Sequence, residues 1–596
     1  MKGQLEIHSQ NILPIIKKWL YSEKDIFVRE LVSNACDAIH KVKLLQEKGE
    51  VESGGDFRVD IRIDKEKRTL TFSDNGIGMD GEEVIKYIAQ IAFSGAEDFV
   101  SKYQTGSEKD QFIGHFGLGF YSAYMVSDKV EVSTRSYKPG TEAVLWVCDG
   151  SSEYTLEKGT REGRGTDITL YLNSDSDEYL EKSRLQTILK HYCAFLPYPV
   201  YLEGTLINEE EPLWIKSPSE CSQSDYLRFY KAIEPYAEEP LFWIHLNVDY
   251  PFNLKGILYF PHIARDFDFN KSSVKLFCNR VFVSDNCKEL IPEYLMALRG
   301  VIDSHDIPLN VSRSYLQMDR TVRQLSGHIS KKVADSLALL FKNERDRFEG
   351  MWDAISTFIK LGVLQDEKFF ERIKDSLLFK TTKGEFKTLA DLGQKIIYTT
   401  QEGHEDHLHA SYEEIVILNQ PIDPYFVSAI EKYCSGTSFR RLDADLGEHL
   451  IDAEREKTIL DAEGRTEAGK IADFIRKEIG EDKIEVEAKS LKNDQISAFL
   501  VLDENTRRMR DYLAQRDPKG SSGFLNTFKK KMVVNTNSPL IRAIHLLESK
   551  DSELAKELVH EVYELALLGQ REMDEKRLSD FISRTTKVLE NLVTRL

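Results

Sequence analysis

The stretch that decides the fold of this chain is RELVSNACD, residues 29–37. In and around it, apolar residues recur at positions 27, 28, 31, 32, 35 and 39. This is the period of an α-helix with a wide buried face. The sequence therefore predicts a helix from Ile26 to Lys41 that packs against the protein core.

The polar residues of this helix also follow a pattern. Glu30, Asn34 and Asp37 are spaced so that they share one stripe of the helix surface. An amide between two carboxylates can hold a hydrated magnesium ion at Asn34 and orient a water molecule at Glu30. Taken alone, the stripe is more typical of an ordinary solvated face. Two further motifs favour the first interpretation.

The second motif is DNGIGM, residues 74–79. It follows an alternating strand at 69–73, and Asp-Asn-Gly is also a turn signal, so a hairpin is the alternative. Residues 82–92 read as a helix instead of the matching strand that a hairpin needs. A carboxylate at a strand end, with glycine nearby for a flat ring to approach, suits an adenine amino group that donates to Asp74.

The third motif is GHFGLGF, residues 114–120, which leads into a segment at 120–126 that can start a helix. Backbone amides exposed by glycines at a helix N-terminus form an anion site, suited to phosphates. Flexible loops often give such a pattern alone. Gly165-Thr166, which opens a strand at 167–172, adds a fourth contact. The three motifs together, in this order, indicate a bound ATP.

The motifs resemble those of the gyrase, histidine kinase and MutL class of ATPases. The sequence beyond these motifs resembles that of the ninety-kilodalton heat-shock (Hsp90) chaperone family, bacterial HtpG type, along nearly the whole chain. The later segments that carry the resemblance are Glu211–Trp214, Leu290–Glu293, Leu309–Arg313 with Gln317, and Val534–Ile541.

This resemblance implies an α+β multidomain fold in three parts. Residues 1–204 would form an N-terminal α/β sandwich that binds ATP, as in the gyrase, histidine kinase and MutL class. Residues 212–478 would form an α/β middle domain, which supplies a phosphate-contacting arginine and a client surface. Residues 479–596 would form an α+β dimerisation domain that ends in a helical bundle.

The resemblance also assigns roles to residues. Glu30 would orient the hydrolytic water, with Arg29 as its partner before closure. Arg313 would reach the terminal phosphate from the second domain, with Gln317 nearby, although Pro308 and Asn310 alone indicate only a surface loop. The other implied contacts are Asn34 at magnesium and phosphate, Asp37 in the nucleotide site, Asp74 at adenine, Gly78 and Met79 beside the base, Gly117, Gly119 and Phe120 at the phosphates, and Thr166 joined to Asp74 through water.

Two positions depart from the family pattern. Phe93 stands where the family commonly has lysine, and His115 stands where many members have glutamine. The first removes a positive charge expected near the nucleotide, and the second alters the phosphate loop. We expect weaker or slower nucleotide use than is usual in the family.

Composition narrows the class of protein. The 596 residues suit three or four domains, and 41% hydrophobic with 30% charged residues is typical of a globular protein. A net charge of −19 argues against a general nucleic-acid binder. Seven scattered cysteines suggest reduced thiols, and neither a signal peptide nor an 18-residue apolar run is evident. We therefore expect a cytoplasmic protein with no membrane partner.

The end of the chain carries two amphipathic helices. Apolar residues recur at 554, 558, 562, 565 and 568, and again at 581, 582, 588, 589, 592, 593 and 596. They either pack onto their own domain or bury each other in a homodimeric four-helix bundle, as the resemblance implies. A candidate client-binding helix spans Asn505–Gln515, with Met509, Tyr512 and Leu513 on one side, before a flexible stretch at 517–523. Taken alone, this pattern is more typical of a helix packed in the core.

The sequence thus predicts a homodimeric ATPase chaperone that uses ATP and Mg²⁺ and acts on partly folded client proteins, with cochaperones among its expected partners. The alternatives are a DNA-acting relative of the same ATPase class, a histidine kinase, and an ATP-gated scaffold with little hydrolysis. A short linker after residue 204 and the lack of an acidic tail point to the bacterial or organellar branch.

Overall fold

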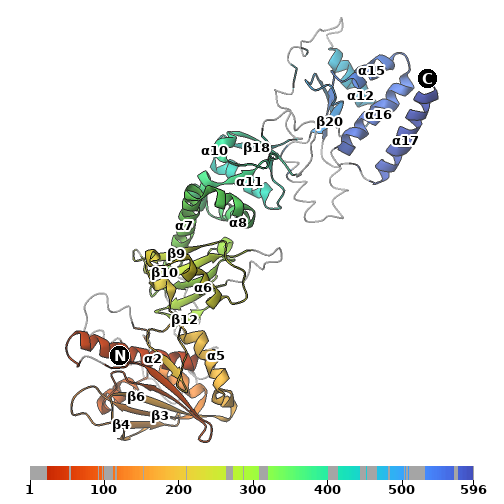
Figure 1. Cartoon of the computed structure of the whole chain (residues 1–596). Coiled ribbons are helices and arrows are strands. Elements are labelled where there is room, and N and C mark those ends of the chain that lie inside the picture. The colour runs from red at the N-terminus through yellow and green to blue at the C-terminus, as the bar shows by residue number, and fades with distance from the viewer. Residues whose placement is uncertain are drawn as a thin grey trace, which may run out of the picture. The chain divides into compact units, whose positions relative to one another are not determined.

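A computed structural model of the chain falls into two compact units, residues 1–336 and residues 337–596, which we describe separately (Figure 1). It describes residues 23–594 with internal gaps. The gaps are residues 53–54, 92, 97, 100–111, 115–116, 152, 210, 251, 263–272, 286, 308–309, 311–319, 401–413, 443–450, 453–454, 456–465, 481–483, 502–503, 505–507, 509–529, 570–572 and 574.

The first unit begins with an eight-stranded sheet of order β5-β4-β3-β6-β2-β1-β7-β8. Its neighbouring strands pair antiparallel, except that β1 and β7 are parallel. In the central β2–β6 pair, Asp74 lies opposite Thr166. The strands are β1 (Val59–Asp64), β2 (Thr69–Asp74), β3 (Ser127–Arg135), β4 (Val144–Cys148), β5 (Thr155–Lys158), β6 (Gly165–Leu172), β7 (Val200–Leu202) and β8 (Thr205–Leu206).

Helices α2 (Ile26–Glu47) and α5 (Lys182–Cys193) lie on one face of this sheet (Figure 1). The apolar positions that predicted α2 are buried against the core, as expected. The predicted helix at 82–92 is shorter: α3 spans Gly81–Tyr87. It ends where the N–H groups of Ile88 and Ala89 both bond to the carbonyl of Val84, a pattern typical of helix C-termini.

The segment after the glycine motif is a 3-10 helix, η3 (Gly119–Met125), and not an α-helix. Another 3-10 helix, η4 (Ser174–Leu180), precedes α5. The i→i+3 bonding of η3 gives a tighter winding than an α-helix. This winding begins at Gly119, so the glycine motif ends directly at a helical N-terminus.

A five-stranded sheet of order β12-β11-β13-β10-β9 follows in the same unit. Its elements are β9 (Phe242–Val248), β10 (Leu254–Phe260), β11 (Ser273–Cys278), β12 (Val281–Ser284), β13 (Arg299–Asp303), the 3-10 helices at Leu213–Ile215, Pro218–Glu220 and Glu293–Leu295, and α6 (Gln223–Ile233). The two sheets share one core, because Trp214 is fully buried and its ring lies 4.8 Å from Phe195 and 5.1 Å from Phe277. Helix α7 (Arg320–Asn343) follows and crosses the boundary between the units.

The second unit holds small sheets and many helices. Its first part contains α8 (Arg345–Gln365), α9 (Glu367–Ile373), the 3-10 helix Lys374–Ser376, β14 (Leu378–Lys380), β15 (Phe386–Thr388), α10 (Leu389–Leu392), β16 (Lys395–Thr399), β17 (Val416–Ile417), α11 (Asp423–Tyr433) and β18 (Ser438–Arg441). Its second part contains α12 (Glu467–Ile479), β19 (Ile484–Lys489), β20 (Ala498–Val501), β21 (Lys530–Asn535), α15 (Pro539–Glu548), α16 (Ser552–Gly569) and α17 (Glu575–Thr594). Figure 1 shows α15, α16 and α17 side by side.

The fold is the mixed α/β multidomain arrangement that the sequence predicted, with an eight-stranded sheet in its N-terminal region and helices in its C-terminal region. The predicted boundaries near 204 and 479 stay predictions. Of the predicted client helix Asn505–Gln515, only Arg508 is described, and the stretch at 517–523 lies outside the described residues. Among the helices that the structure describes, none combines the length and apolar character needed to span a bilayer.

Candidate functional site

A cavity of about 220 Å³ receives residues from all three sequence motifs and from β6. The predicted site residues that line it are Glu30, Asn34, Asp37, Asp74, Gly78, Met79, Gly117, Gly119, Phe120 and Thr166. Arg313, Gln317 and His115 lie outside the described residues. The structure therefore gathers every predicted site residue that it describes around one cavity, which we call the nucleotide cavity.

The polar stripe of α2 forms one wall of this cavity. Glu30 is 7% exposed and Asp37 is 6% exposed, while Asn34 is partly buried. The interpretation of the stripe as a solvated face is therefore wrong. Asp37 holds the glycine motif directly, because its carboxylate accepts the N–H of Ile113 at 2.8 Å and that of Gly114 at 2.7 Å.

Glu30 is held in place from two sides. The guanidinium of Arg29, itself 1% exposed, donates to one Glu30 oxygen at 2.8 and 3.0 Å. The other oxygen faces Gly119 so closely that a Cβ on residue 119 would overlap it. Glycine at position 119 therefore allows the carboxylate to approach the N-terminus of η3. This places a possible water-orienting group beside the backbone amides suited to phosphates.

Asp74 lies at the buried end of β2. Its Oδ1 accepts the N–H of Gly76 at 2.8 Å, and burial raises its pKa to about 7. The hairpin interpretation is wrong, because α3 follows β2. Gly78 is required here, since its φ is +62° and a Cβ would run into the carbonyl of Arg135.

A small hydroxyl network lies next to Asp74. Thr134 and Thr166 are 2.9 Å apart at their Oγ1 atoms, and the N–H of Met79 donates to Thr134 at 3.0 Å. The Nη2 of Arg161 donates to the backbone oxygen of Asp74 at 2.7 Å. Sequence reasoning missed both residues: Thr134 joins this network through the pairing of β3 with β6, and Arg161 reaches Asp74 from the loop between β5 and β6.

The charge of the lining is strongly unbalanced. Four carboxylates line the cavity, at Glu30, Asp37, Asp74 and Glu83, against one described cation, Lys41. Lys41 donates to the carbonyl of Gly95 at 3.1 Å, and burial lowers its pKa. Sequence reasoning missed this lysine, although it continues the stripe of Glu30, Asn34 and Asp37 one helical turn further.

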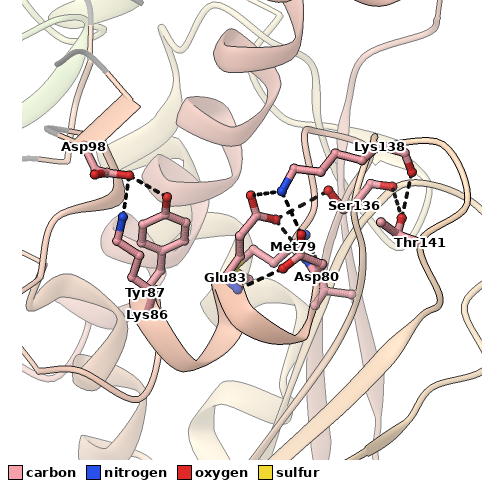
Figure 2. Close-up of polar contacts among 10 residues, drawn as sticks. Met79, Asp80, Glu83, Lys86, Tyr87, Asp98, Ser136, Lys138 and Thr141 are labelled. Carbon is pink, nitrogen blue, oxygen red and sulfur yellow. Dashed lines mark hydrogen bonds and ion pairs between the residues drawn. The ribbon is translucent and has the colours of Figure 1, made fainter. Parts of the chain in front are cut away.

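Phe93 lines the cavity as an aromatic wall. The centroid of its ring lies 6.0 Å from that of Tyr87. The Nζ of Lys86 lies 5.0 Å from the Phe93 centroid. Figure 2 shows Lys86 and Tyr87 both directed to Asp98, at 2.9 and 2.7 Å. The lysine that contacts the Phe93 ring is thus already paired with a carboxylate.

The same view shows a second cluster at the start of α3 (Figure 2). Lys138 donates to Asp80 at 2.7 Å and to Glu83 at 2.8 Å. Asp80 and Glu83 also cap α3 reciprocally, each side chain accepting the other's backbone N–H at 3.0 Å. These contacts fix the edge of the cavity, since Glu83 lines it.

The oxygen donors in the cavity fit a magnesium ion whose coordination shell is completed by a nucleotide. Among the described residues, no three His, Cys, Asp or Glu side chains form a metal cluster. Mg²⁺ typically takes one or two protein oxygens and completes its shell with waters and phosphates. The amide of Asn34, beside Glu30 on the cavity wall, offers such a partial set.

Comparisons with known proteins give two family matches along the chain. Residues 201–595 match the family described as "Hsp90 protein", and residues 21–156 match the "Histidine kinase-, DNA gyrase B-, and HSP90-like ATPase" domain. The chain is similar to proteins named "Chaperone protein HtpG". The one from Porphyromonas gingivalis strain W83 is 41% identical, with 97% of this chain and 89% of that protein covered.

Two further relatives with the same name extend the comparison. The protein of Bacteroides fragilis strain YCH46 is 40% identical, with 93% of this chain and 86% of the relative covered. That of Desulfitobacterium hafniense strain Y51 is 31% identical, with 98% of each covered. From the nucleotide cavity and these matches together, the chain belongs to the Hsp90 family and has an ATPase domain of the type shared with histidine kinases and DNA gyrase B.

Proposed function

We propose that the nucleotide cavity binds ATP with Mg²⁺ and hydrolyses it, and that this cycle drives the action of the chain on its clients. As a member of the Hsp90 family, the chain is an ATPase and an ATP-dependent molecular chaperone. What we add is the division of labour among the residues around the cavity. The family match favours neither a DNA-acting relative nor a kinase.

One observation carries the proposal. Three segments that are far apart in the sequence meet at a single cavity, with Glu30 beside the N-terminus of η3 and with Asp74 at the end of β2. We call the surroundings of Glu30, Asn34 and Gly119 the phosphate end. We call those of Asp74, Gly78 and Thr166 the base end. This polarity suits a nucleotide, which has an apolar ring with an amino group at one end and charged oxygens at the other.

At the base end, ionised Asp74 accepts the adenine amino group, with Thr166 nearby and Gly78 and Met79 beside the ring. At the phosphate end, the amides of Gly117, Gly119 and Phe120 donate to phosphate oxygens. Asn34 would hold the magnesium ion, which would supply positive charge to neutralise the phosphates, and Lys41 contributes the one described cation of the lining. Asp37 supports this end by holding Ile113 and Gly114.

For hydrolysis, Glu30 orients the attacking water and acts as the general base that accepts its proton. Arg29 holds the Glu30 carboxylate until the nucleotide is in place. We further propose Arg313 as a second catalytic group at the terminal phosphate, with Gln317 beside it. A guanidinium brought in from elsewhere in the chain would make hydrolysis depend on a conformational change.

The test compares Glu30→Ala with Asp74→Asn in steady-state ATP hydrolysis and in direct nucleotide binding. We expect Glu30→Ala to retain binding and to lose about a hundredfold or more in turnover, as for a lost general base. Asp74→Asn should instead lose binding. If Glu30→Ala turns over at the wild-type rate, the assigned role is wrong and a contaminating ATPase or a scaffold function becomes the better explanation.

Family membership gives client binding and dimerisation in general terms. We propose that dimerisation uses α16 and α17. Phe581 and Val588 of α17 are buried, whereas other apolar residues on these helices remain open to solvent: Leu565, Leu568, Leu578, Ile582, Leu589 and Val593. Such a face suits a four-helix bundle with a second copy.

Sedimentation measures this directly. The wild type should be dimeric at micromolar concentration, and Ile582→Glu with Leu589→Glu should be monomeric while ATP binding is retained. A monomeric wild type would end this proposal. We also place the protein in the cytoplasm, because none of its seven cysteines, all of them among the described residues, forms a disulfide, as suits a reducing compartment. Clients would be partly folded proteins, with cochaperones as further partners.

A further inference from the structure

A second cavity lies on the other side of α2 from the nucleotide cavity, within the first unit. It has a volume of about 880 Å³. Cys36, Asp37 and His40 of α2 line one side of it, and the Asn279–Arg280 turn with Asp303 lines another. Asp37 lines both cavities. The wall between the two is therefore thin, and it is built around this one carboxylate.

The Asn279–Arg280 turn connects β11 to β12. Cys278 pairs with Val281, so the loop is two residues long, and its φ angles are +51° at Asn279 and +64° at Arg280. Tight hairpins of this kind favour asparagine at the first position and glycine at the second. Arginine at the second position is strained, and such strain persists only where the surroundings fix the backbone.

Asp303, at the end of β13, fixes this turn. Its Oδ2 accepts the backbone N–H of Arg280 at 3.0 Å and the indole N–H of Trp214 at 3.0 Å. Asp303 is 9% exposed, and Trp214 lies in the core shared by the two sheets. The tip of the hairpin is thus anchored to the second sheet through a buried carboxylate.

From this anchored tip, the side chain of Asn279 reaches the segment that borders the nucleotide cavity. Its Nδ2 donates to the carbonyl oxygen of Phe112 at 3.1 Å. The next two residues, Ile113 and Gly114, donate their N–H groups to Asp37. Residues 112–114 are therefore held from opposite sides, by the second sheet through Asn279 and by α2 through Asp37.

The position of Phe112 matters to the nucleotide cavity. Its ring is 1% exposed and lies 5.8 Å from that of Phe99, which lines the cavity. Gly114 also lines the cavity, and a Cβ there would lie 3.0 Å from Asp37 and 3.5 Å from the amide oxygen of Asn34. A shift of the 112–114 backbone would therefore change both the apolar wall and the surroundings of Asn34.

We propose that Asn279 is a positioning residue for ATP turnover. It holds the backbone of residues 112–114 in place beside the phosphate end, and turnover therefore depends on the second sheet. Asn279 does not line the nucleotide cavity, and it acts through Phe112. This inference rests on the ATPase function proposed above. It differs from a purely structural contact, which would change stability without changing the catalytic step.

The experiment uses the full chain with Asn279→Gly. Glycine suits the positive φ, so the turn is kept while the donor is removed. The matched control is Arg68→Gly, which changes another non-glycine residue of positive φ, in a turn that borders neither cavity. A second variant, Asn279→Asp, keeps a turn-compatible side chain but places a carboxylate against the Phe112 carbonyl.

We expect Asn279→Gly to lower kcat for ATP by roughly threefold to tenfold, the value of one lost hydrogen bond, with adenosine affinity unchanged. Amide hydrogen exchange at Ile113 and Gly114 should speed up by a similar factor, and Asn279→Asp should lose at least as much kcat. Arg68→Gly should match the wild type in both measurements.

Wild-type kcat and exchange in Asn279→Gly would overturn the proposal, as would an equal loss of kcat in Arg68→Gly. Faster exchange at Ile113 and Gly114 with unchanged kcat would also overturn it, since the contact would then be structural only. If the wild type itself shows no ATP turnover that depends on Glu30, the failure lies in the proposed function, and the exchange measurement still reports whether Asn279 holds the segment.

Discussion

The two ends of the nucleotide cavity are built in different ways. The base end depends on strand pairing, because the β2–β6 register places Asp74 opposite Thr166 and next to the Thr134 hydroxyl. The phosphate end depends on α2 and on loop segments with glycines, which contact each other through Asp37 and Gly119. Sheet hydrogen bonds fix the first end, whereas single contacts between a helix and loop segments fix the second.

Adenosine and ATP separate the two ends experimentally. A change at the base end should weaken both ligands alike, because both carry adenine. A change at the phosphate end should weaken ATP, or slow its turnover, and leave adenosine unaffected.

The largest effect is expected from Gly119→Ala. The added Cβ would overlap the Glu30 carboxylate, so the carboxylate must move away from the η3 N-terminus. Misplacing a catalytic group by about 1 Å can cost on the order of a hundredfold in rate, and we expect that loss in kcat. Adenosine affinity should stay the same. Gly163→Ala is the matched control, because the space around Gly163 is open; equal activities of the two variants would contradict the close-approach argument.

Lys41→Met should have the next largest effect. It removes the one described cation of the lining while keeping a side chain of similar length. A charge-assisted contact is worth about tenfold or more, so we expect ATP affinity to fall by that factor while adenosine affinity is retained. Lys43→Met, on the same helix but outside the nucleotide cavity, serves as the control. Equal losses for ATP and adenosine would place Lys41 in a structural role.

The base end should be sensitive to pH. Because burial raises the pKa of Asp74 to about 7, the carboxylate that accepts the adenine amino group becomes protonated as the pH falls below that value. We expect adenosine affinity to drop about tenfold between pH 8 and pH 6, and calorimetric titration measures it. Adenosine is the right probe, since ATP phosphate oxygens also titrate in this range.

The stability of the ligand-free protein should show the opposite trend. A carboxyl whose pKa is raised by folding contributes stability that is fully present when the pH is below its pKa in the unfolded state. This stability is lost as the pH rises through about 7, its pKa in the folded state. Asp74→Asn should therefore flatten the pH dependence of unfolding between about pH 4 and 7.

Adenosine affinity that is constant from pH 6 to pH 8 would show that an ionised Asp74 is not the acceptor.

Phe93→Lys should have the smallest effect. It restores a charge at the cavity wall, and a partly exposed cation near phosphate contributes about threefold in ATP affinity. Adenosine should bind no better, and Phe93→Leu, which adds no charge, should gain nothing with either ligand. No gain in ATP affinity or turnover for Phe93→Lys would argue that this position does not limit nucleotide use.

Much of the site could be predicted from the sequence. The helical period fixed which face of α2 is buried, and motif spacing identified Glu30, Asn34 and Asp37 on the cavity side. The family resemblance supplied roles that spacing alone cannot assign. These roles remain proposals for the individual residues, although the family and its ATPase activity are confirmed.

Other residues could not be found in this way, for physical reasons. Thr134 joins the Asp74 end of the cavity through the register of β3 with β6, and Arg161 through a loop contact, neither of which a single sequence specifies. Asn279 reaches Phe112 across 167 positions of sequence, from a turn whose composition is not the usual one. Lys41 could have been found, because the stripe on α2 extends to it, but the predicted helix ended at this residue, and a lone lysine at a helix end is usually solvated.

The aromatic cluster around Trp214 has a practical consequence for dissecting this protein. A fragment that stops at residue 204 would leave Phe195 without the rings of Trp214 and Phe277, which lie 4.8 and 5.5 Å from it. That cut would turn a piece of interior into an apolar surface and invite self-association. We expect an isolated ATPase fragment of that length to self-associate more readily than one cut after the five-stranded sheet, which keeps these rings covered.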